Sequence, residues 1–214
     1  MLPLAPEGYP YALVPALVGI LAWAFGYPAV AVACWLIMLA GVAFFRDPAR
    51  HTDASADVVL SPADGKVLSV GAAPAALAGI GLPHRVSIFM SPANVHVNRA
   101  PISGTVREAR HTPGSKFPAF RDKASDLNEH SFVLLEGAHG TVAYKQIAGA
   151  LARRVVCDLA TGQEVTRGDR VGIIKFGSRV DLFLPQHATI DVRPGQRTRA
   201  GLTPVARLGT PGRP

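Results

Sequence analysis

The sequence predicts a mainly β fold, arranged as a sandwich or barrel with few short helices, behind an N-terminal α-helical membrane anchor. Two observations predict it: a long uncharged apolar run near the N-terminus, and short β-rich segments separated by Gly and Pro after that run. The 214 residues therefore divide into an anchor over 1–45, a β-rich domain over 46–197 and a flexible basic tail over 198–214. The tail is assigned because Gly, Pro and Arg dominate its composition.

The apolar run extends from Tyr11 to Phe45 and contains no charged residue. A helix that spans a bilayer needs about 20 apolar residues. Gly, Tyr and Pro at 26–28 interrupt the run and leave legs over 11–25 and 29–45. Two membrane interpretations stay open, a tight helical hairpin with short legs and a single span with an interfacial piece. A pair of buried core helices is the alternative to both.

Basic residues begin immediately after this run, with Arg46 and Arg50, whereas residues 1–45 contain no Lys or Arg. The positive-inside rule therefore predicts an anchor in the cell membrane with residues 46–214 on the cytoplasmic side. The net charge of +7 suits anionic partners, either anionic lipid or nucleic acid. The two cysteines are too few for a disulfide framework.

Beyond residue 48, runs of strand character follow one another at short spacing and predict the β-rich domain. Residues 73–80 and 148–155 are short helix candidates. The segments ADGKV and ISGTV resemble two related hairpin turns, and GDRVG at 168–172 is a turn that lipoyl and biotinyl carrier domains also use. The expected strands lie within 58–70, 84–90, 95–109, 131–137, 141–149, 170–176, 179–185 and 188–195.

Gly177 and Ser178 interrupt two good strand segments, and Gly weakens a strand. No nucleophile elbow G-x-S-x-G surrounds Ser178, and no S-x-x-K is present there. A bulged strand is one interpretation of the pair. The other is chemical: the serine hydroxyl attacks the carbonyl of Gly177, the peptide becomes an ester, and β-elimination follows. Glycine helps because it has no Cβ and tolerates strained dihedral angles.

Three motifs decide between these interpretations: SPADGKV at 61–67, MSPANVHVNRAP at 90–101 and KFGSRVDLFLP at 175–185. They occur in this order behind an apolar segment that ends in FFRDPAR. Together they resemble the short form of the phosphatidylserine decarboxylases. The resemblance extends from the apolar segment to Pro185, and three such motifs in order are highly specific.

The resemblance implies a proenzyme that cuts itself between Gly177 and Ser178 within a catalytic domain over 46–197. The products are a β chain, 1–177, and an α chain, 178–214, that stay together. Ser178 becomes a pyruvoyl group, whose ketone forms a Schiff base with the amine of phosphatidylserine. Loss of carbon dioxide then gives phosphatidylethanolamine, as pyridoxal phosphate enzymes do with a bound cofactor. The implied partners are the phospholipid and the membrane, and a homo-oligomer is compatible with the sequence.

Asp64 matches the family aspartate that assists self-cleavage, although Asp-Gly is also a common turn pair. His96 matches the histidine that handles protons during decarboxylation. Two positions depart from the common pattern: Arg99 stands where a second histidine is expected, and Arg179 replaces a threonine. Arginine cannot act as a base. His96 could therefore serve both steps, or another histidine could contribute, namely His84, His111 or His130.

The expected substrate-binding residues are Arg99, Lys116, Asn128 and Glu129. Arg99 could bind phosphate or carboxylate bidentately. The other three belong to the polar segment 111–130, where Lys and Arg alternate with Phe. This segment is either a mobile surface loop or a lid over the lipid headgroup, with its aromatic rings in lipid.

Other function classes find less support. The main alternative is a membrane-anchored lipoyl-like carrier or adaptor, which needs an exposed lysine at a hairpin tip and predicts no self-cleavage. A nucleic-acid binder is allowed by the charge, but no zinc or recognition-helix pattern is present. No metal is expected, because the histidines show no ligand spacing with cysteine.

Overall fold

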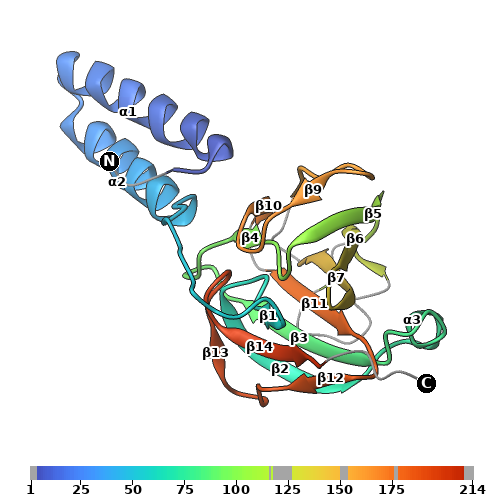
Figure 1. Cartoon of the computed structure of the whole chain (residues 1–214). Helices are drawn as coiled ribbons and strands as arrows, with labels where there is room; N and C mark the ends of the chain where they lie inside the picture. Colours follow the sequence, from blue (N-terminus) through green and yellow to red (C-terminus); the bar gives the residue numbers. More distant parts are fainter. Residues whose placement is uncertain (1–3, 116, 118–126, 150–153, 176–177, 210–214) are drawn as a thin grey trace. The chain divides into compact units, whose positions relative to one another are not determined.

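The computed structural model describes residues 4–115, 117, 127–149, 154–175 and 178–209. The chain forms two compact units, Met1–Ala49 and Arg50–Pro214 (Figure 1). The boundary lies close to the one expected from the end of the apolar run.

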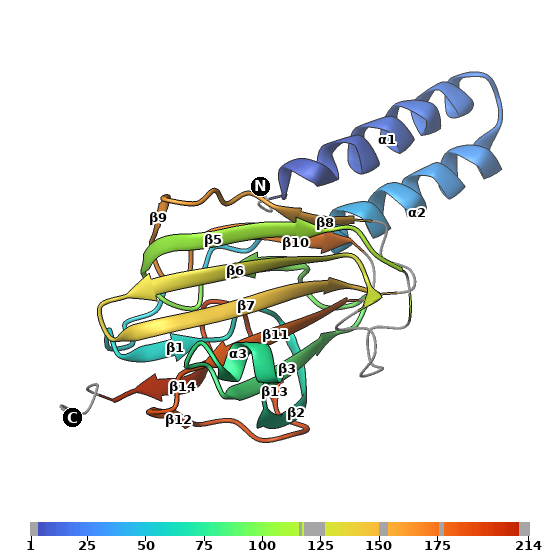
Figure 2. The ribbon, with the colours of Figure 1, turned by 90° about the vertical axis from the view of Figure 1, so that its right-hand side faces the viewer.

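The first unit is a helical hairpin. A 3-10 turn, η1 (Pro6–Gly8), precedes α1 (Tyr9–Ala24) and α2 (Pro28–Phe44), which lie side by side in both ribbon views (Figures 1 and 2). The break between the helices falls at the Gly-Tyr-Pro interruption, where Gly26 has φ 82°. Trp23 and Trp35 hold the helices together, with ring centroids 5.9 Å apart. Among the described residues, no helix has both the length and the apolar character needed to cross a bilayer.

The second unit is mainly β, as predicted. An eight-stranded sheet has the order β13-β2-β3-β11-β7-β6-β5-β9 and curls into a half-barrel (Figure 2). Two three-stranded sheets, β1-β14-β12 and β4-β10-β8, complete the domain, and the described strands pair in antiparallel fashion in all three sheets. The strands are β1 (Val58–Leu60), β2 (Gly65–Ala72), β3 (His84–Met90), β4 (Val97–Arg99), β5 (Gly104–Thr112), β6 (His130–Gly137), β7 (Gly140–Ala148), β8 (Arg154–Cys157), β9 (Glu164–Val165), β10 (Arg170–Lys175), β11 (Ser178–Leu184), β12 (Ala188–Ile190), β13 (Arg197–Thr198) and β14 (Pro204–Leu208).

Strand β11 is central in the large sheet and is fully buried because its two faces pack into different layers. Val180, Leu182 and Leu184 belong to the main core inside the curl. Phe183 belongs to a smaller cluster on the other, outer face, covered by the short helix α3 (Ala75–Ala78). A strand buried on both faces is expected to be mainly apolar. Strand β11 departs from this at Ser178, Arg179 and Asp181, which are buried as well.

Three sequence expectations are corrected by the structure. ADGKV and ISGTV do not close hairpins: the first leads from β1 to β2 and the second from β4 to β5, and in both cases the two strands belong to different sheets. The helix expected over 148–155 is wrong at its described ends, because Ala148 ends β7 and Arg154 begins β8. The remaining helix candidate, 73–80, contains α3.

The tail from residue 198 is not flexible where the structure describes it. Strand β13 pairs with β2, and β14 lies between β1 and β12. Val205, Ala206 and Leu208 are buried in the main core. Composition suggested disorder because Gly and Pro surround these few apolar residues, but the residues bury enough surface to order the segment.

Candidate active site

Ser178 is the first residue of β11, and its side chain is buried. It lies opposite Met90 of β3 on one side and Ala148 of β7 on the other. Its hydroxyl donates to Met90 Sδ at 3.3 Å. Gly177 lies outside the described residues. The serine is thus held at the end of a central strand, with neighbours that fix its backbone on both sides.

Buried amides surround this position. Asn98 Nδ2 donates to Met90 Sδ at 3.6 Å and to Pro62 O at 3.3 Å. Gln146 Nε2 donates to Asn98 Oδ1 at 2.8 Å. Sequence reasoning did not single out these residues. Both residues could have been found from the sequence. Asn98 lies within the motif MSPANVHVNRAP, and Gln146 is a polar residue at a core-facing position of β7 where the alternation predicts an apolar one.

His96 is fully buried just before β4. Its Nδ1 lies 2.9 Å from Asn94 O, so Nδ1 carries the proton of the neutral ring and Nε2 has the basic lone pair. Its backbone oxygen accepts a hydrogen bond from Ile174 N at 3.3 Å. Ile174 belongs to β10, which leads into Ser178 along the chain. The structure therefore places His96 beside the segment that carries the expected cleavage site.

Asp64 directly precedes β2. It lies near the end of the large sheet at which β11 begins with Ser178. Lys66 pairs with Phe89, and Phe89 pairs with Arg179. A Cβ on Gly65 would lie 2.1 Å from the carbonyl oxygen of Phe89, so only glycine fits between the two strands. The Asp-Gly pair thus positions a carboxylate and also allows a close backbone approach.

The Asp64 carboxylate is clamped by Arg50, with oxygen–nitrogen distances of 2.5 and 2.9 Å. The two side chains are only 12% and 6% exposed. Ala200 completes the cluster: its N–H donates to Asp64 Oδ1 at 2.7 Å, and its carbonyl accepts from Arg50 Nη1 at 2.8 Å. A bidentate arginine fixes the orientation of a carboxylate. The arginine after the apolar run therefore organises the site, which the sequence did not reveal.

Replacement of Arg50 by Gln is expected to destabilise the domain by about 3–5 kcal/mol, because it leaves Asp64 buried without its countercharge. The same change should slow self-cleavage, since Asp64 loses its fixed orientation. Denaturant unfolding and the rate of appearance of cut chain measure the two effects. The matched control is Arg107→Gln, because Arg107 pairs with Glu136 at the surface. An equal loss in both variants would contradict the structural role of the clamp.

The expected substrate-binding residues make structural contacts. Arg99 donates from Nη1 to Gly168 O at 2.9 Å. Asn128 is buried and donates to Phe117 O at 2.7 Å and to Ala148 O at 2.6 Å. It therefore ties the segment before β6 to the residue opposite Ser178.

Glu129 accepts from Val155 N at 3.1 Å and lies 3.6 Å from Nε2 of His111. Lys116 lies outside the described residues. For Lys116, as for Arg99, Asn128 and Glu129, substrate binding stays a prediction.

The alternative histidines lie far from Ser178 or point away from it. His84 pairs with Leu184 at the other end of β11, about 20 Å away at the rise of a strand. His111 is on β5, three strands from β11, or about 14 Å along the sheet. His130 lies on the outer face, and burial lowers the pKa of its imidazole, as do Lys145 and Arg110 nearby. Among the described histidines, His96 fits the site best.

Arg179, next to Ser178, makes structural contacts. Its side chain lies on the outer face, where it donates to Asp181 at 2.6 and 2.8 Å and to Ser87 at 3.2 Å. The ion pair is completely buried. The arginine that replaces the expected threonine is therefore part of a structural pair.

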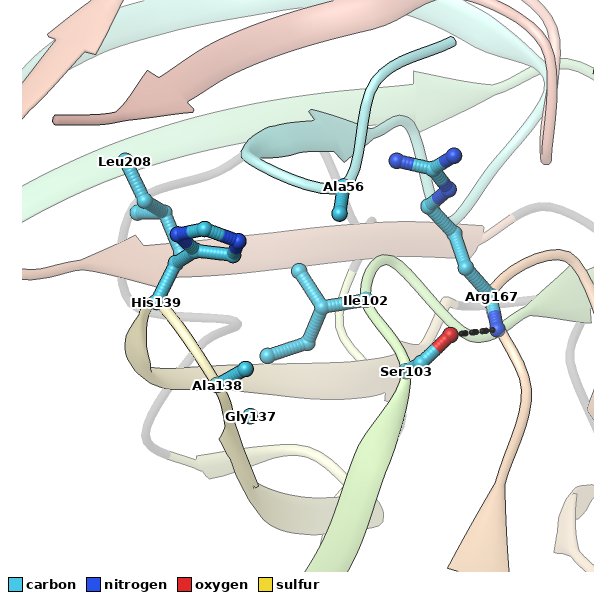
Figure 3. A pocket seen from close by; sticks show the side chains of 8 residues that line it. All are labelled: Ala56, Ile102, Ser103, Gly137, Ala138, His139, Arg167 and Leu208. Carbon is cyan, nitrogen blue, oxygen red and sulfur yellow. Dashed lines mark hydrogen bonds between the residues drawn. The ribbon is translucent and has the colours of Figure 1, made fainter. Parts of the chain in front are cut away.

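The pocket shown in Figure 3 lies elsewhere. It has a volume of about 130 Å³ and surrounds the turn between β6 and β7, at the opposite end of β7 from Ala148. Arg167 points along its wall, but its guanidinium donates to the carbonyls of Ala54, Ser55 and Val58. The backbone N–H of Arg167 donates to Ser103 Oγ, the dashed line in Figure 3. The guanidinium and the hydroxyl thus form hydrogen bonds within the protein. Asp64, His96 and Ser178 do not line this pocket, so it is not the candidate active site.

Comparisons with known proteins point to one family. A model of the family "Phosphatidylserine decarboxylase" matches residues 40–206. A phosphatidylserine decarboxylase proenzyme of Magnetococcus marinus is 43% identical over 209 residues, which is 95% of this chain and 94% of the relative. One of Pelodictyon phaeoclathratiforme is 46% identical over 172 residues, 80% and 81% of the two chains.

The match includes Asp64, His96 and Ser178 and ends within β14, so it covers most of the β-rich unit together with the end of α2. A relative that aligns with nearly its full length leaves no large part of either chain unaccounted for. The chain therefore belongs to the phosphatidylserine decarboxylase family.

Proposed function

We propose that the chain is a proenzyme that cuts itself between Gly177 and Ser178 and then converts phosphatidylserine to phosphatidylethanolamine and carbon dioxide. Family membership supports the reaction. The observation that carries the proposal is Ser178 itself, a buried serine at the first position of a central strand. The carrier alternative finds no support at the lysine of ADGKV, because Lys66 lies within β2, paired on both sides, and not at a hairpin tip.

Self-processing begins at the hydroxyl of Ser178. Its Oγ attacks the carbonyl carbon of Gly177, the amide C–N bond breaks, an ester C–O bond forms, and the hydroxyl proton ends on the released nitrogen. β-Elimination then transfers the Cα proton of Ser178 to a base and breaks the Cβ–Oγ bond, which frees Gly177 as a carboxylate. Hydrolysis of the remaining enamine consumes one water and releases ammonia, and a keto group remains at the new N-terminus.

The surroundings of Ser178 fit such a group. Its backbone is registered with Met90 and Ala148, so the new N-terminus stays in place after the cut. The pyruvoyl carbonyl would supply an electron sink for the electron pair that remains when carbon dioxide leaves the substrate. Asn98 and Gln146 supply buried amide groups next to it. Such groups stabilise charge without reorganisation during the reaction.

Two residues handle protons in this proposal. Asp64, oriented by Arg50, assists the attack by Ser178. The basic Nε2 of His96 first takes up a proton and then delivers it to the carbon that has lost carbon dioxide, while Nδ1 donates to Asn94 O. Arg99, at the turn that contains Gly168, binds the phosphate or carboxylate of the lipid.

The helical hairpin is proposed to anchor the enzyme at the cell membrane, with the β-rich unit on the cytoplasmic side. Large apolar side chains cover its surface, with Leu13, Leu17 and Ile37 about 60% exposed. Such a surface is unfavourable in water and suits lipid. Arg46 follows the hairpin and satisfies the positive-inside rule. Arg50 does not contribute to it, because its charge is paired with Asp64.

Intact-mass measurement of the purified protein tests the proposal. We expect two chains, 1–177 and 178–214, and a small chain that resists N-terminal sequencing and reacts with carbonyl reagents. The expected activity is release of carbon dioxide from phosphatidylserine. A folded, membrane-bound protein that stays in one piece would overturn the proposed function.

A further inference from the structure

A second pocket lies on the outer face of the large sheet, beneath α3. Its volume is about 300 Å³. Residues of strands β5, β6, β7 and β11 form its floor, and residues of the segment that contains α3 form its wall. Ser178 and Phe183 are five residues apart on β11, or about 17 Å, and their side chains belong to opposite faces. This pocket is therefore separate from the active site.

One side of the pocket is apolar. The segment 71–83, which forms the wall, contains no charged residue. Leu77 packs on the cluster that includes Phe132 and Phe183, and Ile80 remains 57% exposed. An uncharged loop that keeps a large aliphatic side chain in solvent is suited to contact an acyl chain.

The other side is cationic. Arg110 of β5, Phe132 of β6 and Lys145 of β7 form one row across the strands. The Arg110 guanidinium carbon lies 5.9 Å from the centroid of the Phe132 ring. Glu108 lies 3.5 Å from Arg110 at the exposed rim and offsets part of the charge. The cations thus stand beside aromatic surface, an arrangement that suits an anion with an apolar tail.

A further cation lies on this face of the sheet, on β3, two strands from Lys145 and outside the residues that line the pocket. Arg85 pairs with Phe183 and lies on the same outer face, because its neighbour Ser87 there accepts from Arg179. Its Nε is buried, and within the described part of the chain no hydrogen-bond partner is present for it. A buried donor without a partner is costly and favours an anion at this face.

We propose that this pocket binds one anionic phospholipid, with its phosphate on Arg110 and Lys145 and an acyl chain against the segment 71–83. The apolar wall fits the acyl chain, and the cationic floor fits the phosphate. A ligand with only one of these two parts would leave the other side of the pocket without a role. The site gives the β-rich unit its own contact with lipid, without the helical hairpin. Binding does not require the reaction at Ser178.

Photo-crosslinking of the full chain in neutral detergent tests this site. The probe is phosphatidylglycerol with a diazirine in one acyl chain, and labelled peptides are identified by mass spectrometry. We expect label in the peptide that contains 71–83, with at least tenfold less after Arg110→Gln combined with Lys145→Gln, since each cation near a lipid phosphate contributes about fivefold. Ile80→Ser should also reduce the label. Arg107→Gln, three residues from Arg110 and paired with Glu136, is the matched control and should leave it unchanged.

Three outcomes would overturn the proposal. One is equal labelling by phosphatidylcholine with the same chain, which would show that the phosphate charge is not read. Another is equal labelling by a diazirine fatty acid, which would make the occupant a free acid. The third is label that persists in the double variant while its unfolding midpoint matches that of the parent. A Ser178→Ala background should retain labelling, so failure of the proposed reaction and failure of this site are distinguishable.

Discussion

Replacement of Ser178 by Ala is expected to leave a single chain of 214 residues that does not decarboxylate phosphatidylserine. In the proposed reaction the hydroxyl is the nucleophile for the cut and also the oxygen that leaves in the elimination, so no other group could form the keto function. Removal of one buried hydroxyl is a small change in volume, and the β-rich unit should still fold. Intact mass and carbon dioxide release measure the two losses together.

Ser131→Ala is the matched control for Ser178→Ala. Ser131 is also a buried strand serine of the large sheet, but it lies on β6, two strands from β11. It should be cut and active. A Ser178→Ala protein that is still cut at 177, or that still releases carbon dioxide, would refute the assignment of the nucleophile.

Replacement of His96 by Gln is expected to preserve the cut and to lower the rate of decarboxylation by about 10²–10⁴-fold, the usual contribution of a positioned acid or base. Glutamine keeps a polar side chain of similar length at a fully buried position, but it cannot exchange a proton. The fraction of cut chain and the turnover of that cut fraction must be measured separately. Only then do the two steps have separate readouts.

His187→Gln serves as the control because His187 is exposed beyond the far end of β11. Neither step should change in it. If His96→Gln instead remains uncut, His96 also takes the proton of Ser178, and the role given to Asp64 in the attack is wrong. This comparison answers the question raised by Arg99, which stands where a second histidine was expected.

The mainly β character could be predicted because Val, Ile and Phe segments alternate with Gly and Pro at short spacing. The assignment of strands to sheets could not be predicted. ADGKV looks like a hairpin turn, but strand β1 pairs with β14, which is far away in sequence. Local turn chemistry contains no information about which distant strand completes a pair. The ordered segment 204–208 was missed for the same reason, because its stability comes from β1 and β12.

The candidate site was predicted to the extent that its residues lie in the three motifs. Asp64, His96 and Ser178 were found in this way. Their partners were not, because Arg50 and Gln146 reach the site through contacts with residues distant in sequence. A charge just after an apolar run reads as a topology signal, whereas the structure uses Arg50 to neutralise a buried carboxylate.

The position of β11 between β3 and β7 has a consequence for the lifetime of the mature protein. Before the cut, this strand reaches its place as part of one chain, so folding is unimolecular. After the cut, residues 178–214 supply β11 to β14 to three neighbouring strands, β3, β7 and β2, and to β1. Once such a two-chain protein unfolds, the chains diffuse apart. Refolding then requires two separate chains to associate, instead of one chain to fold. The barrier to unfolding, rather than an equilibrium, then determines how long the active form survives.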